Sequence, residues 1–207
     1  MKIVHLFHNL MNLYGEYANV LALKRELENN GTAVVVEEQS VGDKIDLADA
    51  DFIYIGSGTE KNQKAALEAV RPYKNALSAA LERGAVVLAT GNSFEMFGSK
   101  ITDKNGRDYE GLGFFDFTVT ESDKRTVTDS ICAFNGGEII GFVNKASEIS
   151  GVKNPLFSVK QGAGNSSEDA ANEGVHEGNF YGTHIIGPLL IRNNAVAKYF
   201  AELLAKK

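Results

Sequence analysis

The sequence is poor in several residue types that mark extracellular domains and flexible linkers. Its 207 residues include a single cysteine, Cys132, and three prolines. One cysteine excludes an intramolecular disulfide and is typical of a protein in a reducing compartment. The few prolines, and the lack of an extended low-complexity tract, argue against a disordered linker or a division into separate units. We therefore expect one domain over residues 1–207.

Long apolar runs and clusters of positive charge are also missing. Lys and Arg number 21 against 27 Asp and Glu, which gives a formal net charge of −6 without any basic run. Nucleic-acid binding is therefore not expected. No segment approaches the roughly 20 apolar residues that span a bilayer. Residues 1–7 lead directly into a strand-like run without the features of a signal peptide. The sequence thus indicates a soluble, cytoplasmic protein that does not enter a membrane.

Short apolar runs alternate with helical periodicity in the first half of the chain. The pattern predicts strands at residues 2–7, 32–37, 51–55 and 85–90. It predicts helices at residues 13–30, 60–83 and 94–97, the second interrupted near Pro72, whose ring removes a backbone donor. Strands that alternate with helices are typical of a mostly parallel sheet covered on both faces.

The pattern changes in the second half, where short strands follow one another without helices. We expect them at residues 118–120, 126–134 and 138–143, as an antiparallel or mixed extension of the sheet. A polar loop at residues 161–179, a final strand at 181–186 and an amphipathic helix at 193–207 complete the chain. The predicted fold class is α/β, with a mostly parallel central sheet, flanking helices and an antiparallel extension.

Two loops lie where open α/β sheets bind ligands, beyond the carboxyl ends of the parallel strands. In Gly56-Ser57-Gly58 the small residues let backbone N–H groups approach an anion, although such a segment also forms a simple tight turn. Thr90-Gly91-Asn92-Ser93 forms a strand-to-helix elbow, the kind of turn that presents a nucleophile in many α/β enzymes. No cysteine stands there, and Ser93 is well placed to cap the helix.

Several short motifs occur in an order that resembles one family. They are Asn12-Leu13-Tyr14, Asn19-Val20-Leu21-Ala22-Leu23, Ile55-Gly56-Ser57-Gly58 with Gln63, Glu110-Gly111-Leu112-Gly113, Phe115-Asp116-Phe117, Ile140-Gly141-Phe142-Val143-Asn144, Gly162-Ala163-Gly164-Asn165, Glu173-Gly174-Val175-His176, Gly182-Thr183 and Gly187-Pro188-Leu189. Together they resemble the class I glutamine amidotransferases of the cobyric-acid-synthase type, and among these the glutaminase subunits of bacterial lipid II isoglutaminyl synthase. The resemblance implies a flavodoxin-like fold, with oxyanion or ligand-binding roles for Gly56, Ser57, Gly58, Gln63 and Asn92.

The chain departs from the family at the two positions that carry the chemistry. The family elbow reads Cys-Gly-Gly-aromatic-Gln, and alignment on Phe94 places Gly91 at the cysteine and Glu95 at the glutamine. Near the C-terminus the family reads Gly-Thr-x-x-His-Gly-Pro, and Ile186 stands at the histidine. Hydrolysis of glutamine needs a thiolate to attack the amide and a base to move the proton. The resemblance therefore implies a glutaminase-like protein that has lost both catalytic residues.

A few other residues are candidates to replace the lost pair. Thr90 and Ser93 carry hydroxyl groups near the elbow, and His184 lies two residues before Ile186, on the same face if the strand continues. Cys132 lies within a predicted strand and fits a small buried apolar residue. The sequence offers no metal site and no cofactor motif.

Three functions stay open at this point. Members of the family pair a glutaminase with an ATP-dependent ligase. The resemblance therefore implies a partner- or ligand-binding subunit that docks on a Mur-ligase-like or other amide-ligase subunit. Such a subunit would still bind glutamine or a similar small amide. The alternative is an active glutaminase that delivers ammonia to such a partner through a shifted nucleophile. A flavodoxin-like nucleotide or flavin binder ranks last, because the chain has no phosphate-binding fingerprint.

Overall fold

The computed structural model describes residues 1–206, and its main feature is a six-stranded sheet in the order β11-β12-β4-β3-β1-β2. Five of these strands run parallel, and β11 pairs antiparallel with β12. The strands are β1 (Lys2–Leu6), β2 (Val35–Gln39), β3 (Phe52–Ile55), β4 (Val86–Thr90), β11 (Val175–Glu177) and β12 (Phe180–Thr183). The predicted parallel sheet is therefore present.

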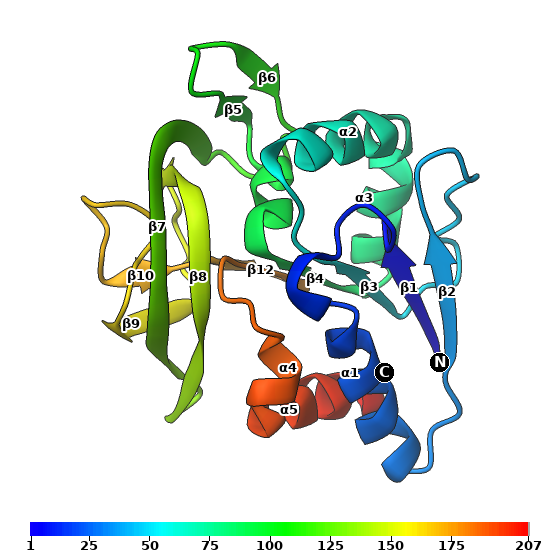
Figure 1. Cartoon of the computed structure of the whole chain (residues 1–207). Helices are drawn as coiled ribbons and strands as arrows, with labels where there is room; N and C mark the ends of the chain where they lie inside the picture. Colours follow the sequence, from blue (N-terminus) through cyan, green and yellow to red (C-terminus); the bar gives the residue numbers. More distant parts are fainter. Residues whose placement is uncertain (207) are drawn as a thin grey trace.

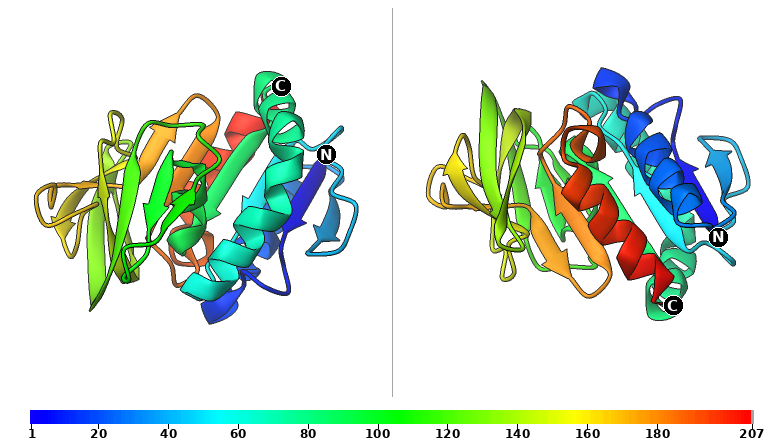
Figure 2. Two further views of the ribbon diagram at one scale, coloured as in Figure 1. Left: turned by 90° about the horizontal axis from the view of Figure 1, so that it is seen from above. Right: turned by 90° about the horizontal axis from the view of Figure 1, so that it is seen from below.

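Helices cover both faces of this sheet (Figures 1 and 2). The helical segments are η1 (Leu13–Gly15), α1 (Ala18–Asn29), α2 (Glu60–Val70), η2 (Arg71–Tyr73), α3 (Lys74–Glu82), η3 (Gly91–Phe97), α4 (Leu189–Arg192) and α5 (Asn194–Ala205). Successive strand side chains point to opposite faces. Residues such as Val4, Ile53 and Val87 therefore pack with α2 and α3, whereas Ile3 and Phe52 pack with α1 and α5.

A second sheet stands beside the first and is mostly antiparallel (Figure 1). It contains β5 (Lys100–Thr102), β6 (Asp108–Glu110), β7 (Thr118–Phe134), β8 (Gly137–Ser150), β9 (Phe157–Gln161) and β10 (Asn172–Glu173). The long β7–β8 hairpin forms its body, with a shift in register between Glu121 and Thr126. These features confirm the predicted α/β class with antiparallel strands in the second half of the chain, but those strands form a separate sheet and do not extend the first one.

Several predicted boundaries are wrong, each for a local reason. The expected helix at 13–30 is split into η1 and α1, because Tyr14 adopts a left-handed conformation with φ 62°. The separate strands at 118–120 and 126–134 are one strand, β7. The expected loop at 161–179 contains the short strands β10 and β11. The helix at 60–83 is interrupted beside Pro72, as predicted.

The last strand of the central sheet also ends earlier than predicted, at Thr183 instead of residue 186. Beyond it, the backbone N–H of His184 donates to Glu173 Oε1 at 2.7 Å. The N–H of Ile185 donates to Thr183 Oγ1 at 2.9 Å. Side-chain oxygens thus replace the carbonyl groups of a neighbouring strand, and the chain turns out of the sheet. Of the predicted helix at 193–207, α5 covers Asn194–Ala205, and Lys207 lies outside the described residues.

Candidate functional site

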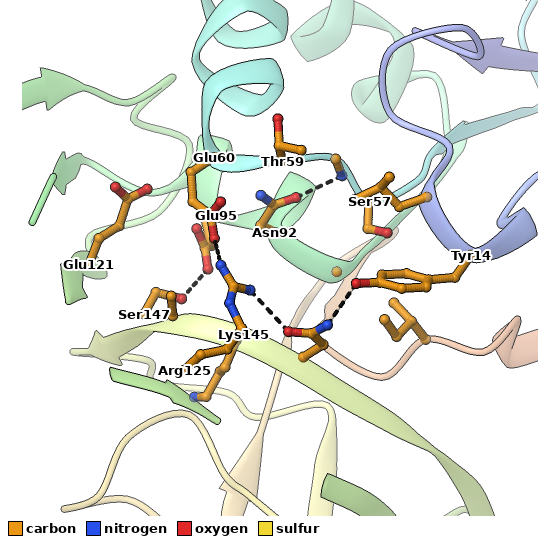
Figure 3. A pocket seen from close by; sticks show the side chains of 16 residues that line it. Tyr14, Ser57, Thr59, Glu60, Asn92, Glu95, Glu121, Arg125, Lys145 and Ser147 are labelled. Atoms are coloured by element: carbon orange, nitrogen blue, oxygen red, sulfur yellow. Dashed lines mark hydrogen bonds and ion pairs between the residues drawn. The ribbon is translucent and has the colours of Figure 1, made fainter. Parts of the chain in front are cut away.

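A cavity of about 190 Å³ opens between the carboxyl ends of β3 and β4 and the β7–β8 hairpin (Figure 3). This is somewhat larger than the roughly 150 Å³ cavity that holds a benzene molecule in an engineered protein core. Its lining residues come from both sheets and from the N-terminal loop: Leu13, Tyr14, Ser57, Gly58, Thr59, Glu60, Gly91, Asn92, Glu95, Glu121, Arg125, Asn144, Lys145, Ala146, Ser147 and Ile186. The site is therefore small, polar and charged.

Gly91 and Ile186 lie in the wall of this one cavity, although they are far apart in the sequence. Gly91 directly follows β4 and has φ +62°, a conformation that residues with a side chain rarely adopt. Ile186 is buried and pairs with Phe142 of β8 through two backbone hydrogen bonds, of 2.9 and 3.1 Å. The two positions singled out by the family motifs thus converge on one site, and neither supplies a group that can attack or move a proton.

Of the five expected ligand-binding residues, three line the cavity and two support it from behind. Ser57, Gly58 and Asn92 belong to the wall, where Asn92 Oδ1 accepts the backbone N–H of Gly58 at 3.0 Å. Gln63 is fully buried outside the wall and donates to the carbonyl oxygen of Asn92 at 2.6 Å. Gly56 also lies outside the wall, with its backbone packed against the carbonyl of Met11. Gln63 and Gly56 hold the elbow and the loop in place.

The two hydroxyl groups near the elbow point into the protein. Ser93 Oγ is fully buried and donates to the carbonyl oxygens of Ile55, at 2.9 Å, and Thr90, at 2.8 Å. Thr90 Oγ1 is hydrogen-bonded to the buried carboxylate of Glu16 and lies 2.7 Å from Tyr54 Oη. Neither side chain lines the cavity. The structure therefore places both away from any ligand in this site.

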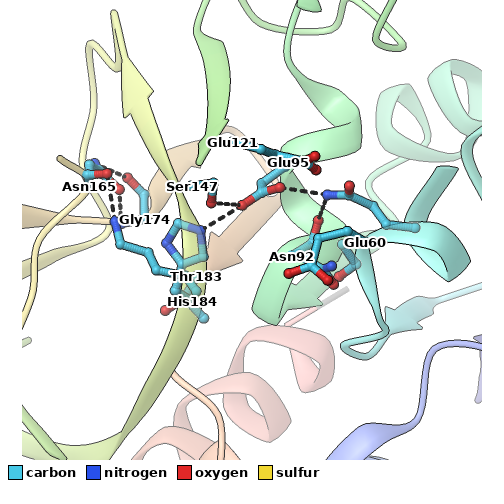
Figure 4. Close-up of polar contacts among 12 residues, drawn as sticks. Glu60, Asn92, Glu95, Glu121, Ser147, Asn165, Gly174, Thr183 and His184 are labelled. Atoms are coloured by element: carbon cyan, nitrogen blue, oxygen red, sulfur yellow. Dashed lines mark hydrogen bonds and ion pairs between the residues drawn. The ribbon is translucent and has the colours of Figure 1, made fainter. Parts of the chain in front are cut away.

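His184 is buried outside the cavity wall, so the expectation that it shares a face with Ile186 is wrong. The strand ends at Thr183, and alternation along a strand no longer applies beyond that residue. His184 Nε2 lies 3.0 Å from Glu95 Oε1 (Figure 4). Its Nδ1 lies 3.5 Å from Glu173 Oε1. The imidazole thus lies between two buried carboxylates.

Glu95 occupies the centre of this buried polar cluster and also reaches the cavity wall. Burial opposes ionisation of its carboxyl group. The hydrogen bond from His184 and its charge, with further hydrogen bonds from Ser147 and Gln63, outweigh burial and hold the pKa of Glu95 below its usual value. A carboxylate with all these partners is held in one position. It acts as a fixed negative charge beside the elbow.

Residues from the β7–β8 hairpin form the opposite wall, and the sequence had given them no role. Arg125 is paired with Glu60 and donates to Asn144 Oδ1 at 3.0 Å, and Asn144 Nδ2 donates to Tyr14 Oη at 2.6 Å. Figure 3 shows this chain of contacts across the cavity. Asn144 ends the family motif at residues 140–144, which is the only sign in the sequence of its position. Nothing in the sequence pattern around Arg125 places it opposite the elbow.

Lys145 adds a buried cation to the same wall. Its Nζ donates to the carbonyl oxygens of Gly164, at 2.6 Å, and Asn165, at 2.7 Å. Burial lowers the pKa of Lys145, although the negative charges of Glu173 and Glu95 oppose the shift. The cavity therefore combines the guanidinium group of Arg125 with several carboxylates, whereas the Lys145 amine is held by carbonyl groups of residues outside the wall.

Cys132 lies on β7, is buried and does not line the cavity; it packs in the cluster that contains α1 and α5. Burial raises the pKa of its thiol to about 11. Over residues 1–206 we found no group of three or more His, Cys, Asp or Glu residues placed to hold a metal ion. Within the same residues, no helix has the length and apolar character needed to cross a membrane.

Comparison with curated proteins finds two relatives with the same description. The chain is 30% identical over 204 residues to the lipid II isoglutaminyl synthase (glutamine-hydrolyzing) subunit GatD of Staphylococcus aureus, covering 98% of this chain and 83% of that protein. It is 31% identical over 213 residues to the subunit of the same name in Streptococcus pneumoniae, covering 100% of this chain and 81% of that protein.

Solved structures with a similar fold include other glutamine amidotransferases. A crystal structure of glutamine amidotransferase has a TM-score of 0.66 at 15% identity and covers 98% of each chain. The structure of PurLQS from Thermotoga maritima has a TM-score of 0.59 at 16% identity, covering 100% of this chain and 99% of the other. These likenesses concern the fold. Residues 2–194 match the CobB/CobQ-like glutamine amidotransferase domain, and with the two curated relatives this match shows that the chain belongs to the CobB/CobQ-like glutamine amidotransferase family.

Proposed function

We propose that this family member no longer hydrolyses glutamine and acts as a ligand- and partner-binding subunit of an amide ligase. The wall of the cavity carries the proposal. It has Gly91 and Ile186 where the family motifs have the nucleophile and the base, and none of its lining residues is Cys or His. Hydrolysis of an amide needs a nucleophile and a group that accepts and returns its proton. Loss of both members of such a pair removes about six orders of magnitude in rate in a triad enzyme.

The remaining polar groups of the wall are suited to holding a small polar molecule. Ser57 Oγ is buried, lines the cavity and has no hydrogen-bond partner among the described residues. Arg125 supplies positive charge, and Glu95 supplies negative charge. Glutamine carries an amide, a carboxylate and an ammonium group, which pair with a hydroxyl, a cation and a carboxylate respectively. We propose glutamine, or a similar small amide, as an occupant that is bound without being cleaved.

The names of the two curated relatives support a ligase partner. Both are subunits of a glutamine-hydrolyzing lipid II isoglutaminyl synthase, and both are matched over nearly the whole of this chain. We propose that this chain likewise docks on the ligase subunit of a cell-wall amidating enzyme, of the Mur-ligase-like type that the family resemblance implies. Since the proposed protein releases no ammonia, the amide nitrogen would come from free ammonia or another source.

Glutamate release from glutamine tests the loss of activity. The native chain is assayed alone and together with a purified ligase subunit from its own host, beside an active glutaminase of the same family at equal concentration. We expect native release at the background rate in both conditions. Turnover within about 100-fold of the active glutaminase would overturn the proposed inactivity, because a site that lacks nucleophile and base falls much further below it.

Calorimetric titration with L-glutamine tests binding in the same cavity. Arg125→Gln is expected to weaken binding by roughly 10-fold or more, because it removes a charge-assisted hydrogen bond. Arg192→Gln is the matched control, since Arg192 is exposed at the end of α4 and does not line the cavity. Equal affinities of these two variants would contradict the proposed ligand site. Failure of the chain to co-purify with any ligase from its host would contradict the proposed partner.

A further inference from the structure

The two loops that close the candidate site lie side by side because of the strand register. Strands β3 and β4 are parallel neighbours, with Ile55 paired to Ala89. Extending this register by two residues places Ser57 beside Gly91. Ser57 is 4% exposed and Gly91 is buried. The residue in the Gly-rich loop and the residue at the nucleophile position therefore share one confined space.

Only one of these two positions has room for a side chain. A Cβ atom built on Gly91 would lie 2.2 Å from Ser57 Cβ and 3.3 Å from Ser57 Oγ. The backbone fixes a Cβ atom, so no rotation of the Ser57 side chain relieves the shortest of these contacts. Without the Ser57 side chain, the nearest remaining distance would be 3.2 Å, to Ser57 Cα. A small shift of the loop would accommodate that contact.

We propose that Ser57 fills the space of the missing nucleophile and is a third determinant of the inactive site. Replacement of Gly91 by cysteine would then not rebuild the elbow while Ser57 is present. Ser57 itself presents a buried hydroxyl to the cavity, with no imidazole in the wall to accept its proton. An unactivated hydroxyl is a weak nucleophile, so this group forms a hydrogen bond to the occupant of the cavity instead of attacking it.

This inference rests on the proposed function only in taking Gly91 as the nucleophile position. Its test measures thermal stability and thiol reactivity, so the outcome is independent of the assays of glutamate release and glutamine binding. Four chains are compared in thermal unfolding and in reaction with iodoacetamide: Gly91→Cys, Ser57→Gly, Ser57→Gly/Gly91→Cys and Ser40→Gly/Gly91→Cys. Ser40 is a matched control, because it is a buried serine that directly follows β2, away from the elbow. The native chain, whose one thiol is buried, gives the blank for labelling.

Gly91→Cys alone is expected to lower the Tm by roughly 10 °C, because it combines overpacking with a strained backbone conformation. Adding Ser57→Gly should recover at least half of that loss, whereas adding Ser40→Gly should recover none. The thiol introduced by Gly91→Cys should react at least about 10-fold faster in the Ser57→Gly background, since the freed space opens it to the cavity.

Three results would overturn the inference. The first is a Gly91→Cys chain as stable as the native protein. The second is a double variant with Ser57→Gly that is no more stable than the Ser40→Gly control. The third is failure of every chain that carries Gly91→Cys to fold, because relief by removing the Ser57 side chain is the central claim. Folding of the Ser57→Gly double variant alone would support the inference directly.

Discussion

His184 provides the sharpest test of how the candidate site is held together. Its imidazole is 2% exposed and lies 3.0 Å from Glu95 Oε1 and 3.5 Å from Glu173 Oε1. Glu95 reaches the cavity wall, so the same contact that stabilises the core also fixes a charge in the site. The substitution His184→Gln keeps a side chain of similar length with a hydrogen-bond donor, and it removes the imidazole that lies between the two carboxylates.

The expected cost follows from burial. Removing one partner of a buried ion pair typically costs about 3–5 kcal/mol, because the remaining charge is left without compensation in a medium of low dielectric constant. The glutamine amide retains part of the hydrogen bonding, so we take the lower end, about 3 kcal/mol. For a chain of this length, each kcal/mol shifts the Tm by roughly 2–4 °C. The expected loss for His184→Gln near pH 6 is therefore roughly 6–12 °C.

The direction of the pH dependence separates charge loss from loss of packing. In the native chain the pKa of Glu95 is depressed. Its contribution to stability is therefore present above the ordinary pKa of 4.5 and is lost as the pH falls through the folded value. Without His184, the two largest effects that lower the pKa of Glu95 are gone and burial still opposes its ionisation, so we expect the variant to lose stability relative to the native chain as the pH rises. The difference in Tm between native and variant chains should therefore grow from pH 4 to pH 6.

Thermal unfolding followed by circular dichroism at pH 4, 5 and 6 measures this difference. The control is His8→Gln, which removes a partly exposed histidine 3.6 Å from Glu38. Surface pairs of this kind contribute at most about 1 kcal/mol. A loss for His184→Gln no larger than the loss for His8→Gln would contradict this account of the buried pair. A loss that stays constant between pH 4 and pH 6 would rule out the electrostatic part and leave only packing.

Two further predictions concern buried groups that do not line the cavity. Burial raises the pKa of Glu16, although Thr90, Gly187 and Tyr54 donate hydrogen bonds to it. The contribution of Glu16 to stability is therefore full below pH 4.5 and is lost as the pH rises. Compared with the native chain, Glu16→Gln should therefore have a higher relative Tm at pH 8 than at pH 5. The opposite trend in melting curves of the two chains would contradict this prediction. The Cys132 thiol, with a pKa of about 11, should react with a disulfide reagent at pH 8 roughly 100-fold more slowly in the native protein than in denaturant, and similar rates in the two states would contradict its burial.

Much of the fold could be read from the sequence because local patterns specify it. Runs such as residues 85–90 are apolar at nearly every position, which marks strands that are buried on both faces. The break beside Pro72 follows from its missing N–H group. Tyr14 adopts a strained left-handed backbone conformation, and β12 ends at Thr183 because a side chain, Glu173, accepts the next backbone N–H group. Neither feature follows from a local sequence pattern, so the sequence did not predict them.

The family, the strand-to-helix elbow at Gly91 and the prediction that Ile186 stands at the histidine position of the family follow from the sequence alone, because motif order and residue identity do not depend on folding. How these positions behave together is a property of the folded protein. Folding turned His184 toward Glu95 and Glu173 and brought Arg125 across from the second sheet. It also set Ser57 against Gly91, so closely that a single Cβ atom lacks room. These arrangements depend on close contacts between segments that are far apart in the chain. Close packing of this kind, unlike hydrophobic periodicity, cannot be recognised in a local stretch of sequence.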